Sequence, residues 1–335
     1  MLTLKESEQL SDQSFKSSLK AFFQRAFATN RLLTLTGLVM LVVLAGTIGG
    51  LIFDERVITG APAWLKPAKF AISISLYCLT FVWLLGFVKG HPRLVAIAAY
   101  VTSIGLLVEM VIIAIQVVRG TTSHFNFTTS LDSILFGVMG MFVMLIWTAN
   151  LLAAFLLLFQ KFPDPVMAWS LRLALFLTLV GAGIAFFMTS PTATQIAEMG
   201  ANARTGIIGA HSVGVADGGP GLPILGWSSV GGDLRVAHFF GLHSLQLLPL
   251  IGWLIARSRN SWLTTGHRVV LVWTAGLGYL GWLAILVWQA LRGQSIVTPD
   301  AATLLAISGL LTIVLTLVAG VFIQASIQRN SPELG

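Results

Sequence analysis

The sequence predicts an all-α integral membrane protein with eight transmembrane helices, arranged as two parallel four-helix repeats with both termini in the cytoplasm. Three observations predict this fold class. First, 56% of the 335 residues are hydrophobic and only 10% are charged, with a mean hydropathy of +0.87, whereas a soluble domain carries about 25% charged residues. Second, apolar runs recur that are long enough to cross about 30 Å of hydrocarbon. Third, polar residues recur in the same order in the two halves of the chain.

The apolar runs place the membrane spans along the chain. We expect spans near 32–53, 68–88, 93–118, 131–159, 167–189, 234–256, 268–290 and 301–325. Residues 1–30 precede them as a cytoplasmic segment, in which Phe22, Phe23 and Phe27 recur at helical spacing beside Lys16 and Lys20. This pattern predicts an amphipathic helix on the membrane surface. Residues 327–335 form a cytoplasmic tail.

One connection is much longer than the others. Residues 191–233 contain ten glycines and a Gly-Gly-Pro-Gly run at 218–221. Such a segment cannot continue as a helix, and loops of this length are usually functional or disordered. We expect a glycine-rich cap, structured or mobile, on the extracytoplasmic side.

The net charge of +7 reflects topology rather than a polyanionic partner. Thirteen of the 20 Lys and Arg residues fall in segments that the spans place in the cytoplasm, which is the positive-inside bias. The sequence therefore predicts the inner (plasma) membrane of a bacterium, the lipid bilayer as partner, and no nucleic acid. Because Cys78 is the single cysteine, a disulfide within the chain is excluded.

Polar residues in matching order indicate a duplication of 31–160 in 161–326. Leu65–Phe70 and Leu234–Phe239 open the second and sixth spans, and Ser75 then matches Ser244 without a gap; Gln116, Arg119 and Asp132 match Gln289, Arg292 and Asp300. The alternative is coincidence, because apolar sequences use few residue types and match easily by chance. The inference therefore rests on the matched polar residues. An even number of spans per repeat gives both halves one orientation, with the symmetry axis along the membrane normal.

The candidate site lies among ionisable residues on the extracytoplasmic side. His124, His211, His238 and His243 all fall there, and none has a histidine at the matching position of the other half. His243 and Glu109 each lie about 13–15 Å inside their spans at 1.5 Å per residue. Because a lone ionisable group is costly in hydrocarbon, we expect a Glu109–His243 contact.

The first hypothesis for this site is haem or metal binding in a redox protein. Imidazole is the commonest ligand of transition metals and a frequent axial ligand of haem. The candidate ligands are His124, His238 and His243, and the cofactor would be haem b or a transition metal. His238 and His243 are turned about 140° apart on one helix, so only one of them would join His124 across the bundle as a ligand. Glu109 would be the hydrogen-bond partner of a ligating histidine.

The layout of two four-helix bundles related by an axis along the membrane normal resembles haem A synthases. Those enzymes place histidine pairs on the even-numbered helices of each half. His124 and His238 fit that pattern in part, whereas Lys69 and the histidine-free eighth span depart from it, and the Glu-x-x-His pattern of the family is absent. The strings Trp64–Phe70 and Gly232–His243 also look like those of uncharacterised bacterial membrane proteins, a likeness that implies no activity.

Two other functions fit the same residues. In a proton-coupled transporter of a small molecule, Glu109, His243 and Gln246 would line the pathway, since parallel repeats commonly enclose one. Lys69, Asp233 and Arg235 would lie at its rim. In a sensory or structural protein, the 191–233 cap would recognise a partner. The redox interpretation stands slightly ahead of transport, and whether the protein is an enzyme stays open.

Overall fold

Eight long helices form the body of the protein. The computed structural model describes residues 4–201 and 206–330, with side chains from Lys16 onward. Within these ranges, eight helices are long and apolar enough to cross a membrane. They are α2 (Arg31–Phe53), α3 (Leu65–Leu85), α4 (Pro92–Val118), α5 (Ser130–Leu158), α6 (Pro165–Gly183, followed by α7, Ala185–Thr189, and α8, Ala193–Gly200), α9 (Leu234–Ala256), α10 (Thr265–Leu291) and α11 (Ala301–Asn330). The predicted multi-pass membrane protein with eight spans is confirmed.

Local sequence explains where several of these helices begin. Asn30, Thr129 and Thr264 precede α2, α5 and α10, and each side-chain oxygen accepts a hydrogen bond from the backbone N–H three residues later. Such caps satisfy backbone donors that the first turn of a helix leaves free. The helices α4 and α6 begin at Pro92 and Pro165, a position where the missing N–H of proline costs no hydrogen bond.

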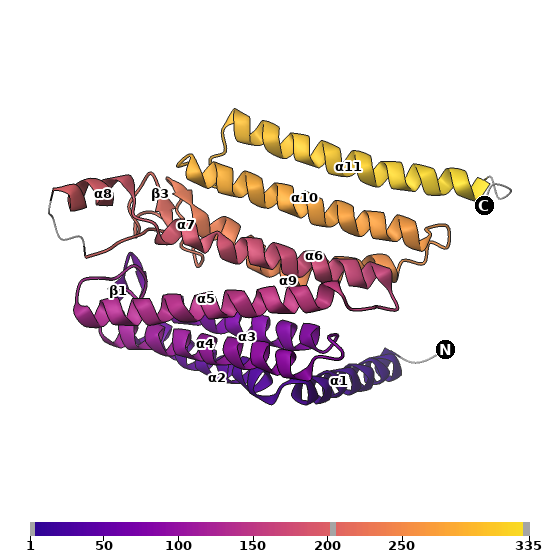
Figure 1. Cartoon of the computed structure of the whole chain (residues 1–335), viewed down its shortest axis with the longest axis horizontal. Helices are drawn as coiled ribbons and strands as arrows, with labels where there is room; N and C mark the ends of the chain where they lie inside the picture. The colour runs from indigo at the N-terminus through magenta and orange to yellow at the C-terminus, as the bar shows by residue number, and fades with distance from the viewer. Residues whose placement is uncertain (1–3, 202–205, 331–335) are drawn as a thin grey trace.

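The helices form two groups of four, which lie one above the other in Figure 1. In the first half, α2 packs on α3 and α4 packs on α5; in the second half, α6 packs on α9 and α10 packs on α11. The two halves meet where α5 contacts α6 and where α3 contacts α9. Within the second half, the backbones of α6 and α9 come very close, because a Cβ on Gly181 would lie 2.4 Å from the Cα of Gly241. Only glycine permits this backbone contact.

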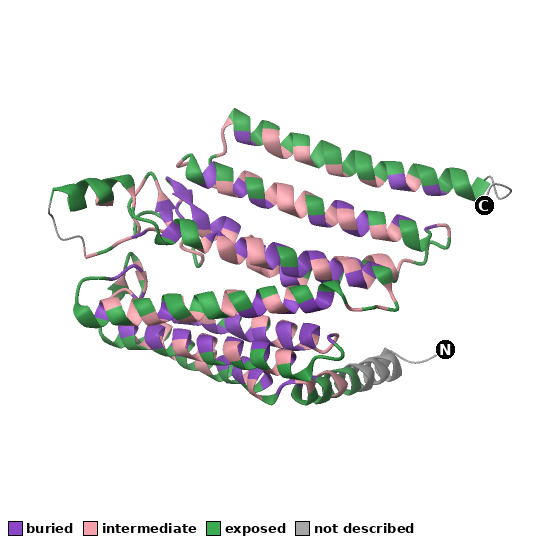
Figure 2. Ribbon diagram, in the orientation of Figure 1, coloured by how far each residue is buried: buried purple, intermediate pink, exposed green. Residues whose placement is uncertain are grey.

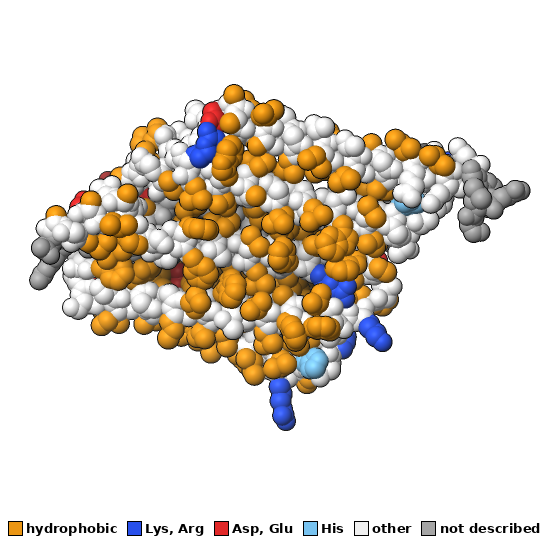
Figure 3. Space-filling model, turned by 45° about the horizontal axis from the view of Figure 1, so that its top comes forward, with side chains coloured by type: hydrophobic (Ala, Val, Ile, Leu, Met, Phe, Trp, Pro, Cys, Tyr) orange, Lys and Arg blue, Asp and Glu red, His pale blue; other side chains and the backbone are white. Residues whose placement is uncertain are grey.

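The exterior of the helices is apolar. Figure 2 shows that exposed residues follow the outer faces of the bundle, and Figure 3 shows hydrophobic side chains spread across one lateral surface, with Lys, Arg, Asp and Glu mainly near its edges. On α2, Val42 is 73% exposed, and on α11 Leu305 is 74% exposed. A soluble protein rarely exposes so large a continuous apolar surface. These faces therefore contact lipid.

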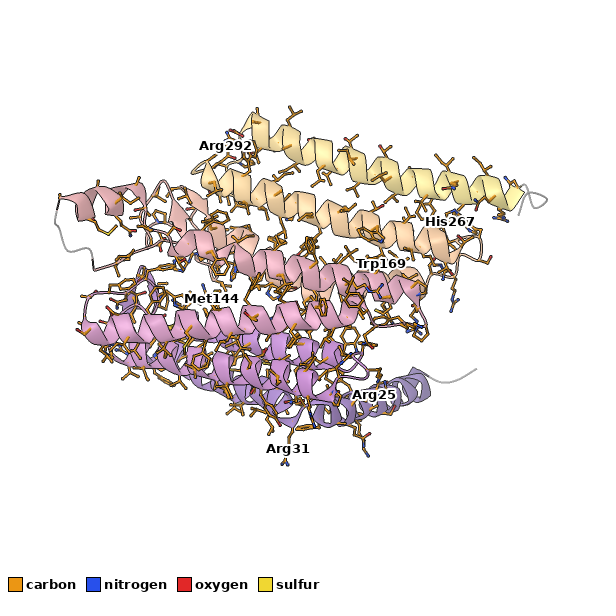
Figure 4. The ribbon with its side chains drawn as sticks, in the orientation of Figure 1. Arg25, Arg31, Met144, Trp169, His267 and Arg292 are labelled. Atoms are coloured by element: carbon orange, nitrogen blue, oxygen red, sulfur yellow. The ribbon has the colours of Figure 1, made fainter. Side chains whose placement is uncertain are left out.

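The two ends of the bundle differ. Both marked chain ends lie at one end, here called the terminal end, and the strands and α8 lie at the opposite end, here called the loop end (Figure 1). Arg25 and His267 lie toward the terminal end and Arg292 toward the loop end (Figure 4). The helix α11 extends to Asn330, so the tail predicted from residue 327 begins as helix, and residues 331–335 lie outside the described residues.

The helix α1 (Leu4–Thr29) precedes the bundle. Phe22 packs against the main hydrophobic core and Ala26 is buried, while Lys20 and Arg25 are exposed. One side of α1 is therefore apolar and held against α2 and α3. Its predicted position on the membrane surface stays a prediction.

The glycine-rich segment 191–233 is folded in its described part, 191–201 and 206–233. It contains α8 and the strands β3 (Ser212–Val213) and β4 (Gly232–Asp233), which pair antiparallel. It also reaches the first half, where β1 (Val57–Ile58) pairs with β2 (Ala61–Pro62). The turn between these strands has Gly60 at φ +71, and a Cβ there would lie 2.1 Å from the carbonyl oxygen of Gly218. The segment therefore bridges the two halves at the loop end.

Candidate functional site

A cluster of ionisable side chains lies at the loop end, beneath the 191–233 segment. Lys66 comes from the first turn of α3, Glu109 from α4 and His124 from the loop between α4 and α5. His211 comes from the 191–233 segment and His238 from the second turn of α9. Residues from both halves and from the 191–233 segment thus meet in one place.

His124 connects Lys66 to Glu109. Its Nδ1 lies 3.0 Å from Lys66 Nζ and 3.0 Å from Ser123 Oγ, and its Nε2 lies 3.4 Å from Glu109 Oε1. When Lys66 is protonated, its Nζ has only donors; Nδ1 is then the acceptor, and the ring proton is assigned to Nε2, facing the carboxyl group. We call these three side chains the Lys66–His124–Glu109 relay.

Glu109 is the most deeply buried member of the relay. The residue is 4% exposed, and its Oε2 atom is buried without a hydrogen-bond partner among the described residues. A carboxyl oxygen in hydrocarbon is costly unless it is protonated or paired. Glu109 is therefore placed to hold a proton, or to accept a hydrogen bond from a molecule that enters the site.

The surroundings of His124 favour its neutral form. Burial lowers the pKa of His124 well below its usual range, and the nearby Lys66, His211 and His238 lower it further. Its ring also packs against Phe70, Phe125 and Phe136, with ring centroids 6.0–6.2 Å apart. At neutral pH the imidazole is uncharged, as the hydrogen bond from Lys66 requires.

A second pair of side chains, His211 and Asp217, lies beside the relay in the 191–233 segment, here called the cap segment. His211 Nδ1 lies 2.7 Å from Asp217 Oδ2, and the two Asp217 oxygens also accept from the backbone N–H groups of His211 and Ser212. Burial raises the pKa of Asp217, but the hydrogen bonds and charge of His211 outweigh it, and the pKa lies well below its usual range. The His211 and His124 rings lie 6.5 Å apart, so Asp217 orients a histidine toward the relay.

His238 and His243 lie in different surroundings, as their spacing on one helix predicts. His238 Nδ1 lies 2.8 Å from the carbonyl oxygen of Gly181, to which it donates. His243 packs on Phe239, with ring centroids 4.2 Å apart, and its Nδ1 lies 3.2 Å from Gln246 Oε1. His238 is therefore turned to α6, and His243 to Phe239 and Gln246.

The predicted Glu109–His243 contact is wrong. The carboxyl group of Glu109 lies beside His124 instead. The two residues do lie at similar depths in their spans, but depth along the membrane normal says nothing about the direction in which a side chain leaves its helix. His124, which the sequence places on a loop, folds back into the bundle and occupies the position expected for His243.

The residues predicted at the rim hold the cap segment in place. Lys69 Nζ donates to the carbonyl oxygen of Leu225 at 2.8 Å. Arg235 pairs with Asp233 and also donates to the carbonyl oxygen of Gly226 at 2.6 Å. All three residues thus bind backbone or one another at the base of the cap. The charged groups of Lys69, Asp233 and Arg235 are therefore already paired or hydrogen-bonded within the protein.

The predicted metal ligands do not form a recognisable metal group. Within residues 16–201 and 206–330, no three His, Cys, Asp or Glu side chains converge as a group that could hold a metal ion. Of the predicted set, His124 has contacts at both ring nitrogens. Haem or a transition metal at His124, His238 and His243 stays a prediction.

Sequence reasoning missed two members of the cluster. Lys66 is part of the repeat motif that opens α3, but its pairing with His124 was not foreseen. Asp217 lies between the glycines of the cap and shows no spacing that marks it as a partner of His211. The available signal was Lys66 itself, a lysine at the start of a span, on the side that the sequence predicts to be extracytoplasmic and that the positive-inside bias disfavours.

Comparisons of the chain with protein-family models, with curated proteins and with solved structures find no match. The chemistry of the cluster has to be interpreted from its own residues.

Proposed function

We propose that this protein is a proton-coupled transporter of a small molecule, with the Lys66–His124–Glu109 relay as its proton-binding site. The observation that carries the proposal is the buried Glu109, which has one oxygen free of hydrogen bonds and the other facing a neutral histidine. Ionisable groups held inside a membrane bundle typically mark ion or proton pathways. A permanent structural ion pair would instead satisfy both carboxyl oxygens.

The relay moves a proton and binds a solute in the same place. His124 holds its Nε2 proton toward Glu109 and accepts at Nδ1 from Lys66, so a proton can pass between the two ends of the imidazole. Among the described residues, His124 is the one hydrogen-bond acceptor of Lys66. The remaining donors of Lys66 and the free Oε2 of Glu109 are available to a solute that carries an acceptor and a donor.

The transport path follows the interface between the halves, along α3 and α9. Beyond the relay, His243 contacts Gln246, and Gln246 Nε2 donates to Thr80 Oγ1 at 3.2 Å. These polar groups extend from the relay toward the terminal end along helices that are otherwise apolar. Rocking of one half against the other would open the site alternately to each side.

This mechanism rests on two parallel four-helix repeats, with both termini in the cytoplasm of a bacterial inner membrane. The helix pairing supports the duplication, because the first helix packs on the second and the third on the fourth in each half. The matched polar residues support it as well. Arg119 pairs with Asp132, and Arg292 pairs with Asp300, each joining the third helix of a half to the start of the fourth.

Uptake into proteoliposomes tests the proposal. The purified protein is assayed with radiolabelled amino acids, monocarboxylates, amines and sugars under an imposed pH gradient, with the lumen alkaline. We expect one class to accumulate only with the gradient, and Glu109→Gln to abolish this accumulation while solute exchange without a gradient persists. The exposed Glu198 on α8 offers a matched control, and Glu198→Gln should transport normally. Gradient-driven uptake that survives Glu109→Gln would refute the proposal.

Haem binding is the second candidate, and one observation favours it. His238 and His211 each have Nδ1 held, by the Gly181 carbonyl oxygen and by Asp217 respectively. Such a partner at one ring nitrogen fixes the orientation of a histidine that ligates iron through the other. Oxidised and dithionite-reduced spectra of protein expressed with ample haem decide the matter. A Soret band that is lost in His238→Ala supports haem, and a featureless spectrum excludes it.

A further inference from the structure

An apolar groove opens on the side of the bundle, where α1, α3 and α9 meet. Its volume is about 430 Å³, and Phe22, Leu79, Thr80, Gln246, Leu250 and Trp253 are among the residues that line it. Leu250 is 51% exposed and Trp253 is 43% exposed. The groove lies on the membrane-spanning surface, so its ordinary surroundings are lipid.

The hydroxyl and amide groups of the groove bind other groups of the protein. Thr80 Oγ1 donates to the carbonyl oxygen of Leu76 and accepts from Gln246 Nε2, while Gln246 Oε1 contacts His243. Among the fully buried side-chain polar atoms of the described residues, none that lines the groove lacks a hydrogen-bond partner. Its walls therefore match a hydrocarbon chain rather than a polar molecule.

Positive charge marks one end of the groove. The guanidinium group of Arg257 lies 4.8 Å from the centre of the Trp253 ring, one helical turn beyond the groove at the terminal end of α9. No acidic side chain in the described part of the chain lies within ion-pair distance of Arg257. On the facing α1, Arg25 is also exposed, three residues from the groove-lining Phe22 and so on the same side of the helix. This edge of the groove is cationic.

We propose that the groove is a binding site for an anionic phospholipid, with an acyl chain between α1, α3 and α9 and the phosphate group at Arg257. Inside a bilayer, apolar contact alone selects poorly, because lipid tails are as apolar as the groove. Selectivity comes from the head group, and basic sites between transmembrane helices attract anionic head groups. The Arg257 guanidinium offers paired donors suited to phosphate oxygens.

The position of the lipid gives it a structural effect. The helices α3 and α9 belong to different halves of the bundle, and the groove lies along their contact. An acyl chain seated there fills the space between the halves and joins them to α1. The relay lies at the opposite end of the same helices, and the groove shares Thr80 and Gln246 with the path proposed for the solute.

Native mass spectrometry of the delipidated full-length protein tests this site, with phosphatidylglycerol and phosphatidylcholine of identical chains as probes. We expect phosphatidylglycerol to bind the wild type with affinity roughly fivefold higher than phosphatidylcholine. Both lipids offer a phosphate group to Arg257, but the quaternary ammonium of phosphatidylcholine cancels the negative charge that attracts the guanidinium group. Arg257→Gln should remove this preference. The exposed Arg259 nearby is the matched control, and Arg259→Gln should keep it.

A second variant tests the groove itself. Because Leu250 is half exposed, Leu250→Trp fills the groove without disturbing the core, and we expect it to weaken binding of both lipids. Equal affinity of the two lipids for the wild type, or an unchanged preference in Arg257→Gln, would overturn the assignment. Unchanged lipid binding in a folded Leu250→Trp variant would likewise overturn it.

Discussion

Replacing Glu109 by Met and His124 by Phe, singly and together, tests the contact on which the proposed function depends. Met has nearly the length of Glu without its oxygens. Phe keeps the shape of the imidazole among the surrounding aromatic rings of Phe70, Phe125 and Phe136. Each single change removes the contact, and the loss of the hydrogen bond between Lys66 and His124 is common to the His124→Phe variant and the double variant. That cost therefore cancels in the cycle.

The geometry sets the size of the expected coupling. If His124 were charged, two unit charges 3.4 Å apart at an effective dielectric constant of about 20 would interact by about 5 kcal/mol. The lowered pKa of His124 makes the ring neutral, which leaves a hydrogen bond to a charged or polar carboxyl group, worth about 1.5–3 kcal/mol. Since 3.4 Å is long for such a bond, we expect a coupling of about 1.5 kcal/mol.

Unfolding by SDS titration in mixed micelles at pH 7.5 gives the free energy of unfolding of the wild type, of the two single variants and of the double variant. A matched cycle between Glu109→Met and His243→Phe serves as the control, because His243 contacts Phe239 and Gln246 instead. We expect that cycle to be additive within about 0.5 kcal/mol. Additive effects of Glu109→Met and His124→Phe would refute the relay. A coupling near 5 kcal/mol would refute the neutral histidine.

Three further outcomes follow from the structure. In SDS titrations, Gly181→Ala should destabilise the bundle by about 2 kcal/mol or more through overpacking against α9. Gly183→Ala is the control: no atom lies within 4 Å of a Cβ there, so this variant should be neutral or slightly stabilising. Arg119→Gln should lower the free energy of unfolding by about 1–3 kcal/mol in the same assay, because the buried Asp132 loses its charged partner. Arg292→Gln should lower it clearly less, because the pair of Arg292 with Asp300 is exposed. Equal losses in the two variants would contradict this. Because burial lowers the pKa of His124 in the fold, the unfolded chain binds more protons once the pH falls below about 6.5. The melting temperature should therefore drop from pH 7.5 to 5.5, and less so in His124→Gln; identical pH profiles would contradict this.

Composition and periodicity were sufficient to predict the membrane class and the helices. Each of the eight spans follows from a run of apolar residues, and in the structure α2, α5 and α6 start at local signals, namely Asn30, Thr129 and Pro165. Hydrocarbon leaves a backbone no alternative to internal hydrogen bonds, so a long apolar run becomes a helix whatever its neighbours are. The same logic indicated that Glu109 and the histidines within or beside the spans need partners.

The identity of those partners depended on the tertiary structure. The contact between His124 and Glu109 is set by how a loop folds back between helices, and the pairing of His211 with Asp217 by the path of a glycine-rich segment. Neither contact follows from a regular spacing of residues along the sequence. The sequence by itself thus determined that eight helices cross the membrane and which residues carry charge within them. Only the packing of the two halves and the cap decided which charges meet, because side-chain direction depends on helix rotation and loop path rather than on depth in the membrane.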